Sequence, residues 1–334
     1  MEASDFDKDG DTDLFLGGRA VPGNYGLPPR SFLLLNDGGT WQEKTPEPLA
    51  GIGMVTDASW ADIDKDGDDD LVVVGDWLSV QIFENQSGTL NKMLEIPNSK
   101  GWWRRIEADD LDSDGDMDFV LGNWGTNSKF QASVQRPLTM YVNDFDDNGK
   151  SEFIINWYAP LDDRPYPFAT KPDLMSQLPE LRKKSLKYED YSKQTYNMLF
   201  PAEVRQRSFP YEVNMLKSAV LWNNAGQFEL KALPVEVQVA PVFGIAVNDW
   251  DEDGFADIWL GGNFYALKPQ VGRQDASRGL FLEGVGKQAF QVVNNSKSGT
   301  YIEGEVRDAT ILKAKDKEVI LVSRNDREAV IFER

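Results

Sequence analysis

The apolar residues of this chain fall in short runs that recur along the sequence. Five runs follow an acidic stretch, and each ends in Gly or Asn, at residues 14–18, 71–75, 119–123, 153–156 and 258–262. Continuous apolar runs bounded by such residues are typical of strands that are buried on both faces. We therefore expect each acidic stretch to be a loop that joins two β-strands.

A second kind of apolar run comes in pairs around a polar turn, at residues 32–41, 80–88, 219–228 and 280–290. We assign the pair at 219–228 to the fourth unit. Four strands in a unit of roughly 45–60 residues is the pattern of a β-propeller blade. A sixth unit keeps this pattern without an acidic loop, at residues 304–312, 318–323 and 329–333. The sequence predicts one all-β domain over residues 1–334, a β-propeller with six recognisable four-stranded blades, and leaves a seventh blade open.

The spacing of the acidic loops is uneven. The third and fourth loops begin 34 residues apart, and the fourth and fifth 105 residues apart. The long interval predicts a partly helical insertion at residues 160–217 within the fourth blade. Between Asp163 and Lys217 it holds ten Lys or Arg against seven acidic residues, in a chain of net charge −20. This insertion is either a solvated helical cap or a docking site for a partner protein.

The five acidic loops share the form D-x-D-x-[DN]-G-x-x-[DE]. Positions 1, 3, 5 and 9 offer carboxylate or amide oxygens, position 7 offers its backbone carbonyl, and the Gly at position 6 permits a sharp reversal. A hard cation that takes six to eight oxygen ligands fits this set, and we expect up to five Ca²⁺ ions. The predicted ligand positions are Asp5, Asp7, Asp9, Asp11 and Asp13; Asp62, Asp64, Asp66, Asp68 and Asp70; Asp110, Asp112, Asp114, Asp116 and Asp118; Asp144, Asp146, Asn148, Lys150 and Glu152; and Asp249, Asp251, Asp253, Phe255 and Asp257.

Two other structures could produce such loops. Plain Asp-Gly surface turns are common, but five copies at one fixed spacing argue against them. An EF-hand needs flanking helices and a Glu at position 12, where this chain has Leu16, Val73, Leu121, Ile155 and Leu260. The fourth loop departs furthest from the pattern, and its occupancy stays open.

Composition narrows the function further. The chain has no Cys and no His, which excludes thiolate nucleophiles, disulfides, Ser-His-Asp triads and zinc sites built on imidazole or thiolate. A net charge of −20 argues against a nucleic-acid partner. No catalytic constellation or cofactor site stands out, so we expect a protein that is not an enzyme. The alternative is a calcium-containing polysaccharide-degrading enzyme, such as a lyase, with Tyr158 or Lys129 as acid or base.

The chain also lacks an apolar run of transmembrane length and a signal peptide, since its first acidic loop begins at Asp5. We expect it to be part of a longer exported protein.

The repeated acidic-loop pattern resembles FG-GAP or VCBS-type repeats. Beyond the loops, residues 53–58, 122–129, 188–191 and 262–265 resemble a bacterial group of surface proteins that is associated with an ASPIC/UnbV region. FG-GAP and VCBS-type repeats are found in integrin α-chain propellers and in many bacterial exported proteins. The resemblance implies a propeller of about seven blades at an extracellular or cell-surface location. It also implies a recognition or scaffold role, with a glycan, peptide or protein ligand.

In a propeller blade, the connections after the second and fourth strands lie on the face opposite the acidic loops. The residues expected there are Trp77, Trp102, Trp103, Arg104, Trp124, Trp157 and Tyr158, with Arg19, Phe264 and Tyr265 at equivalent positions. They either pack between blades or form a platform for a carbohydrate or peptide.

Overall fold

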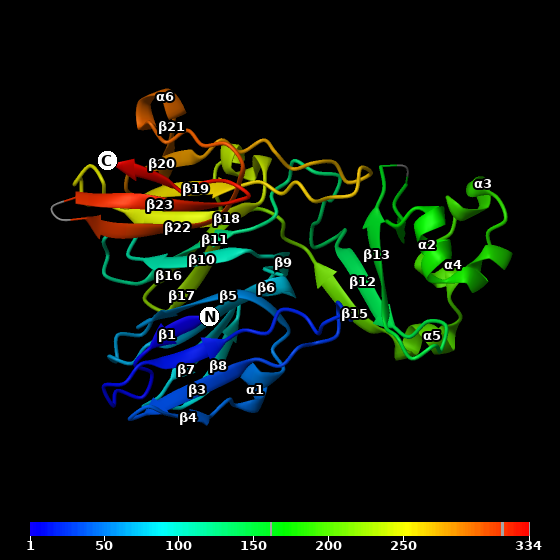
Figure 1. Ribbon diagram of the computed structural model, residues 1–334, viewed down its shortest axis with the longest axis horizontal. Helices are drawn as coiled ribbons and strands as arrows, with labels where there is room; N and C mark the ends of the chain where they lie inside the picture. The colour runs from blue at the N-terminus through cyan, green and yellow to red at the C-terminus, as the bar shows by residue number, and fades with distance from the viewer. Residues whose placement is uncertain (161, 315–316, 334) are drawn as a thin grey trace.

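The computed structural model describes residues 1–160, 162–314 and 317–333, which form antiparallel β-sheets and a few short helices (Figure 1). Five sheets, named sheets 1 to 5 in chain order, pack face to face. A further sheet, the inserted sheet, projects to one side of them together with most of the helices.

Sheets 1 and 2 follow the predicted four-strand order. Sheet 1 contains β1 (Glu2–Ser4), β2 (Asp13–Leu16), β3 (Phe32–Asp37) and β4 (Thr40–Glu43). After α1 (Glu47–Ala50), sheet 2 contains β5 (Met54–Ala61), β6 (Asp70–Leu78), β7 (Gln81–Asn85) and β8 (Leu90–Glu95), with β9 (Gly101–Trp102) paired to β6. Each acidic loop joins the first two strands of its sheet, as the sequence predicts.

Sheet 3 is completed by a distant part of the chain. Its first strands are β10 (Arg105–Asp109) and β11 (Asp118–Gly122), and its outer strands are β16 (Ala219–Asn224) and β17 (Gln227–Ala232). Val120 pairs with Val220 across β11 and β16. The assignment of residues 219–228 to the fourth unit was therefore wrong. Closing a long loop costs little more entropy than closing a short one, so nearly a hundred intervening residues can be accommodated.

Those intervening residues form the inserted sheet, which contains the fourth acidic loop. Its order is β14 (Pro165–Pro167), β13 (Glu152–Tyr158), β12 (Leu138–Asn143) and β15 (Phe209–Val213). The helices fall between β14 and β15, within the expected range 160–217: α2 (Lys171–Gln177), the 3₁₀ helix η1 (Pro179–Lys183), α3 (Tyr188–Tyr191), α4 (Tyr196–Leu199) and α5 (Ala202–Arg207). The short interval between the third and fourth loops thus reflects the interruption of sheet 3 by the inserted sheet.

Sheets 4 and 5 complete the stack. After η2 (Val235–Val239), sheet 4 contains β18 (Val242–Asn248), β19 (Asp257–Gly262), β20 (Leu280–Gly284) and β21 (Phe290–Val293). After α6 (Asn295–Ser298), sheet 5 contains β22 (Glu305–Ala314), β23 (Lys317–Asn325) and β24 (Val330–Glu333). Among the described residues, sheet 5 has three strands instead of the expected four.

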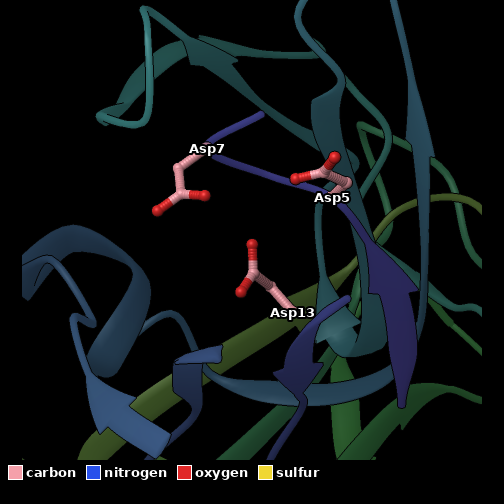
Figure 2. A group of neighbouring side chains, drawn as sticks. All are labelled: Asp5, Asp7 and Asp13. Carbon is pink, nitrogen blue, oxygen red and sulfur yellow. The ribbon is translucent and has the colours of Figure 1, made fainter. Parts of the chain in front are cut away.

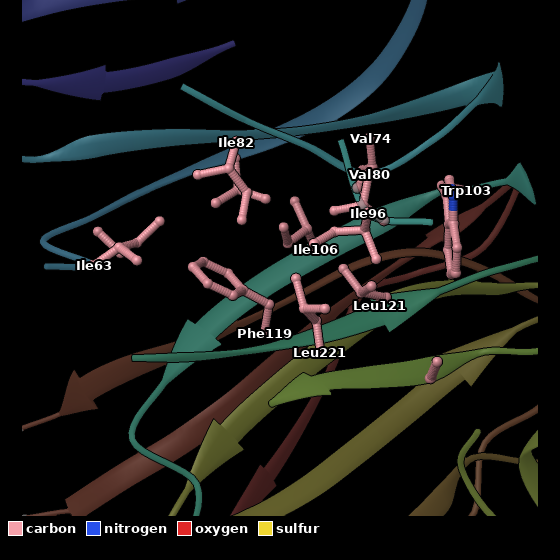
Figure 3. Close-up of a cluster of buried hydrophobic side chains, with 13 residues drawn as sticks. Ile63, Val74, Val80, Ile82, Ile96, Trp103, Ile106, Phe119, Leu121 and Leu221 are labelled. Carbon is pink, nitrogen blue, oxygen red and sulfur yellow. The ribbon is translucent and has the colours of Figure 1, made fainter. Parts of the chain in front are cut away.

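The core lies between neighbouring sheets, and strand periodicity explains it. On β6, Leu71 and Val73 pack towards sheet 1, whereas Val72 and Val74 pack towards sheet 3. Side chains alternate between the two faces of a strand, so a strand covered on both faces must be apolar at every position. Figure 3 shows the layer between sheets 2 and 3, where side chains from both sheets meet. Across the described residues, no buried apolar cluster combines strands of sheet 1 with strands of sheet 5.

In the part of the chain that the structure describes, no helix has the length and apolar character needed to span a membrane.

Candidate metal loops and the covered aromatic face

All five acidic loops adopt the same backbone conformation. Position 4 has a positive φ although it is never Gly, with values of 62° at Lys8, 63° at Lys65, 60° at Ser113, 55° at Asp147 and 60° at Glu252. Position 6 is Gly in every loop, with φ between 83° at Gly149 and 95° at Gly10. Left-handed backbone is costly for residues other than Gly, so its recurrence at one position indicates a shared constraint.

Hydrogen bonds inside each loop turn its carboxylates inward. The position-1 carboxylate accepts from the Gly amide at position 6, for example Gly115 N to Asp110 Oδ2 at 2.9 Å and Gly149 N to Asp144 Oδ2 at 2.7 Å. In the first loop, oxygens of Asp5, Asp7 and Asp13 lie within 4.8 Å of one another (Figure 2). The other clusters at this spacing are Asp62, Asp64 and Asp66; Asp110, Asp112 and Asp118; Asp144, Asp146 and Glu152; and Asp249, Asp251 and Asp253.

The position-9 carboxylate is buried and links the loop to the sheet. Asp118 accepts from Leu111 N at 3.2 Å and from Asn223 N on β16 at 2.8 Å. Asp13, Asp70 and Asp257 likewise accept one amide from their own loop and one from the third strand of their sheet. One carboxylate therefore bonds both its own loop and the third strand of its sheet, which is 15 residues away for Asp70 and 105 residues away for Asp118.

Burial disfavours the ionised form of these carboxylates. Desolvation raises the pKa of Asp118 to about 7 and that of Asp70 to about 6, although the backbone amides oppose the shift. A divalent cation beside these groups would favour their ionised form. Without such a cation, keeping these clustered carboxylates ionised at neutral pH is energetically unfavourable.

Three loop oxygens are buried and have no hydrogen-bond partner among the described residues: Asp62 Oδ1, Asp112 Oδ1 and Asp146 Oδ1. A buried carboxylate oxygen without a partner is costly, and coordination to a cation is one way to satisfy it. The donor set consists of hard oxygens, which suits Ca²⁺. The residues present thus fit the predicted ion.

The loops also join neighbouring sheets. Asn85 Nδ2 on β7 donates to Phe6 O in the first loop at 2.9 Å, and Asn223 Nδ2 on β16 donates to Ile63 O in the second at 3.3 Å. Lys65 pairs with Asp116 of the third loop at 2.6 Å. These contacts were missed at the sequence level, where Asn in a hairpin looks like an ordinary turn residue.

The fourth loop has the same backbone conformation as the other four loops, but its contacts with the rest of its sheet differ. Glu152 at position 9 accepts from Phe145 N at 3.1 Å, and no third-strand amide donates to it among the described residues. This loop belongs to the inserted sheet, whereas the other four lie along the stack.

The expected aromatic face is covered by the inserted sheet. Trp77, Trp102, Trp103 and Trp124 are buried, and Trp77, Trp102 and Trp124 pack with Met140 and Val213 of the inserted sheet. Ring centroids of Trp102 and Trp124 lie 5.6 Å apart in an edge-to-face arrangement. Trp157 and Tyr158 on β13 are partly buried. Trp77, Trp102 and Trp124 therefore pack beneath the inserted sheet and do not form an open platform in this structure.

A buried ion-pair network lies beside these rings. Asp76 is 2% exposed and pairs with Arg104 at 2.7 Å and with Arg19 at 3.1 Å. Arg104 also lies over the Trp124 ring, 5.5 Å from its centroid. The sequence analysis did not identify Asp76 as a candidate. The only feature of the sequence that points to its burial is its position directly after the apolar run 71–75.

The fold and loops together define an all-β repeat protein in which five sheets each carry a candidate calcium loop between their first two strands in chain order. Residues 5–73 and 62–121 match the family described as FG-GAP-like repeat, so the chain contains repeats of this family.

Among solved structures, the V. cholerae biofilm matrix protein Bap1 is similar over 97% of this chain and 59% of its own, with 11% identity and a TM-score of 0.38. A likeness at that level does not bear on fold or function. No curated protein sequence matches the chain.

Proposed function

We propose that this chain is a calcium-stabilised propeller module at an extracellular or cell-surface location, with a scaffold or binding role and no catalytic activity. The observation that carries the proposal is the five-fold recurrence of one loop geometry, with side-chain oxygens gathered within 4.8 Å of one another. The match to FG-GAP-like repeats supports it.

Each loop would hold one Ca²⁺ through the side chains at positions 1, 3, 5 and 9 and the backbone carbonyl at position 7. Bound calcium supplies positive charge and rigid coordination, and it takes no part in chemistry. Five ions would offset half of the formal charge of −20. The ions therefore stabilise the module, while recognition takes place elsewhere on its surface.

A shared axis for the stacked sheets supports the propeller. Arg105 on β10 pairs with Asp57 on β5 at 3.6 Å and with Asp308 on β22 at 3.2 Å. Burial raises the pKa of Glu2 on β1, and the nearby charges of Asp57, Arg105 and Asp308 also affect this pKa. The first strands of sheets 2, 3 and 5 thus meet at one arginine, as the innermost strands of blades do.

The proposal is tested by thermal unfolding of the purified chain, first in excess chelator and then in millimolar calcium. We expect calcium to raise the melting temperature strongly, and calorimetric titration to give more than one bound ion per chain. Magnesium at the same concentration is the control, since it requires a smaller octahedral site and should stabilise less. Equal melting temperatures in chelator and in calcium would contradict a structural role for the loops.

A further inference from the structure

The inserted sheet covers the aromatic face, so a binding role requires a different surface. The helices of the insertion, from α2 to α5, lie at the side of the molecule farthest from the stacked sheets (Figure 1). The surface of these helices has two features that suit a binding site: exposed apolar side chains, and basic side chains without an ion-pair partner among the described residues.

The first feature is an apolar groove between α2 and the segment that follows η1. A cavity of about 430 Å³ is lined there by Pro172, Met175, Leu186 and Tyr188, with Lys171 and Arg182 at its edge. Leu186 is 80% exposed and Tyr188 68% exposed. Lys171 Nζ donates to Leu186 O at 2.8 Å and lies 5.0 Å from the centroid of the Tyr188 ring. The groove wall is therefore held in place before any partner arrives.

A second cavity, of about 320 Å³, lies on the other side of η1. Its apolar lining includes Leu181, Leu199 and Phe200. Its charged lining residues are Lys183, Lys184, Glu180 and Asp146. The same 3₁₀ helix contributes Arg182 to the first cavity. Two apolar hollows thus flank one short helix; the charged residues that line the first are all basic, and those that line the second are two lysines and two acids.

The second feature is charge. Residues 171–187 hold five Lys or Arg and two acidic residues, in a chain of net charge −20. Of the two acids, Asp173 is already engaged by Lys268 at 3.2 Å. Arg182 and Lys183 form no ion pair with any described residue. This surface complements an anionic partner, whereas the rest of the chain would repel one.

We propose that this surface is the recognition site of the module and binds an acidic segment of a partner protein that carries large apolar side chains. Carboxylates of the segment would pair with Arg182 and Lys183, and apolar side chains would enter the hollows beside η1. Such pairing of apolar anchors with a charged rim is the usual anatomy of peptide-binding surfaces. This inference rests on the proposed binding role and gives it a location and a partner class.

The test is fluorescence anisotropy with the calcium-loaded full chain and a labelled synthetic peptide in which Glu alternates with Leu and Phe. We expect saturable binding that Arg182→Glu weakens about tenfold. Leu186→Ser should weaken it as well, because it removes an apolar wall. Lys297→Glu on α6 is the matched control, since it makes the same charge change on an exposed residue remote from the insertion, and it should change affinity less than about twofold. All three positions are on the surface, so calcium-dependent melting should be retained.

Three outcomes would overturn the inference. Arg182→Glu and Lys297→Glu could have equal effects, which would place binding elsewhere. A peptide of Glu alone could bind as tightly, which would leave only general charge attraction. Vesicles with anionic headgroups could bind in preference to the peptide, with the same loss in Arg182→Glu, which would indicate a membrane surface as partner. If the wild type shows calcium stabilisation without peptide binding, only this inference fails; if calcium stabilisation itself is absent, the proposed function fails first.

Discussion

Asp118 offers a direct test of the link between the metal loops and the sheets. It is buried, and its carboxylate accepts hydrogen bonds from Leu111 N and Asn223 N. Asp118→Ala would leave both amides without an acceptor, at about 1–3 kcal/mol each. We therefore expect a loss of about 2–6 kcal/mol in the free energy of unfolding, even in chelator, where no cation contributes.

The matched control is Glu152→Ala in the fourth loop. Glu152 is also buried at position 9, but the amide bonded to it from within the loop is Phe145 N, and no strand amide adds to it among the described residues. Its removal should cost about 1–3 kcal/mol. Both variants lose a predicted calcium ligand, so their difference reports the contact with β16.

Urea unfolding followed by tryptophan fluorescence would measure both losses, in chelator and in calcium. Hydrogen exchange at the Asn223 amide gives an independent reading, and this amide should lose protection in Asp118→Ala alone. Equal losses in the two variants, together with unchanged exchange at Asn223, would refute the argument that position 9 holds the third strand.

Three further predictions follow from buried charges and rings. Asp76→Asn should cost about 3–5 kcal/mol in urea unfolding, because it leaves the Arg104 guanidinium buried without a full counter-charge, and a loss below about 1 kcal/mol would contradict this. Burial raises the pKa of Glu107 to about 7, although Glu107 pairs with Arg105. The contribution of Glu107 to the free energy of unfolding is therefore fully present below the ordinary pKa of a glutamate, and it is lost as the pH rises through 7. Glu107→Gln should therefore stabilise the chain at pH 8, by at most about 3 kcal/mol, and far less at pH 5; equal effects at the two pH values would count against it. Trp124→Ala should cost about 3–5 kcal/mol in thermal unfolding, and an unchanged melting temperature would show that the ring does not help hold the inserted sheet.

Local pattern was sufficient for the loops. Ligand spacing, the Gly at position 6 and the apolar run after each loop all act within about fifteen residues, so the sequence alone predicted five loops between strands. The structure confirms their placement between the first two strands of a sheet in all five cases. Sheets covered on both faces were likewise visible in continuous runs such as residues 71–75.

Tertiary structure decided which strands belong together and which side chains meet solvent. Residues 219–232 carry the same strand pattern whichever sheet they join, and their pairing with β11 depends on Asp118 meeting Asn223 across 105 residues. The exposure of Trp102 and Trp124 likewise depends on where the inserted sheet rests, which no local pattern specifies. The alternation of side chains along a strand shows whether a face of the sheet is covered. It does not show which part of the chain covers that face, because the covering layer comes from elsewhere in the sequence.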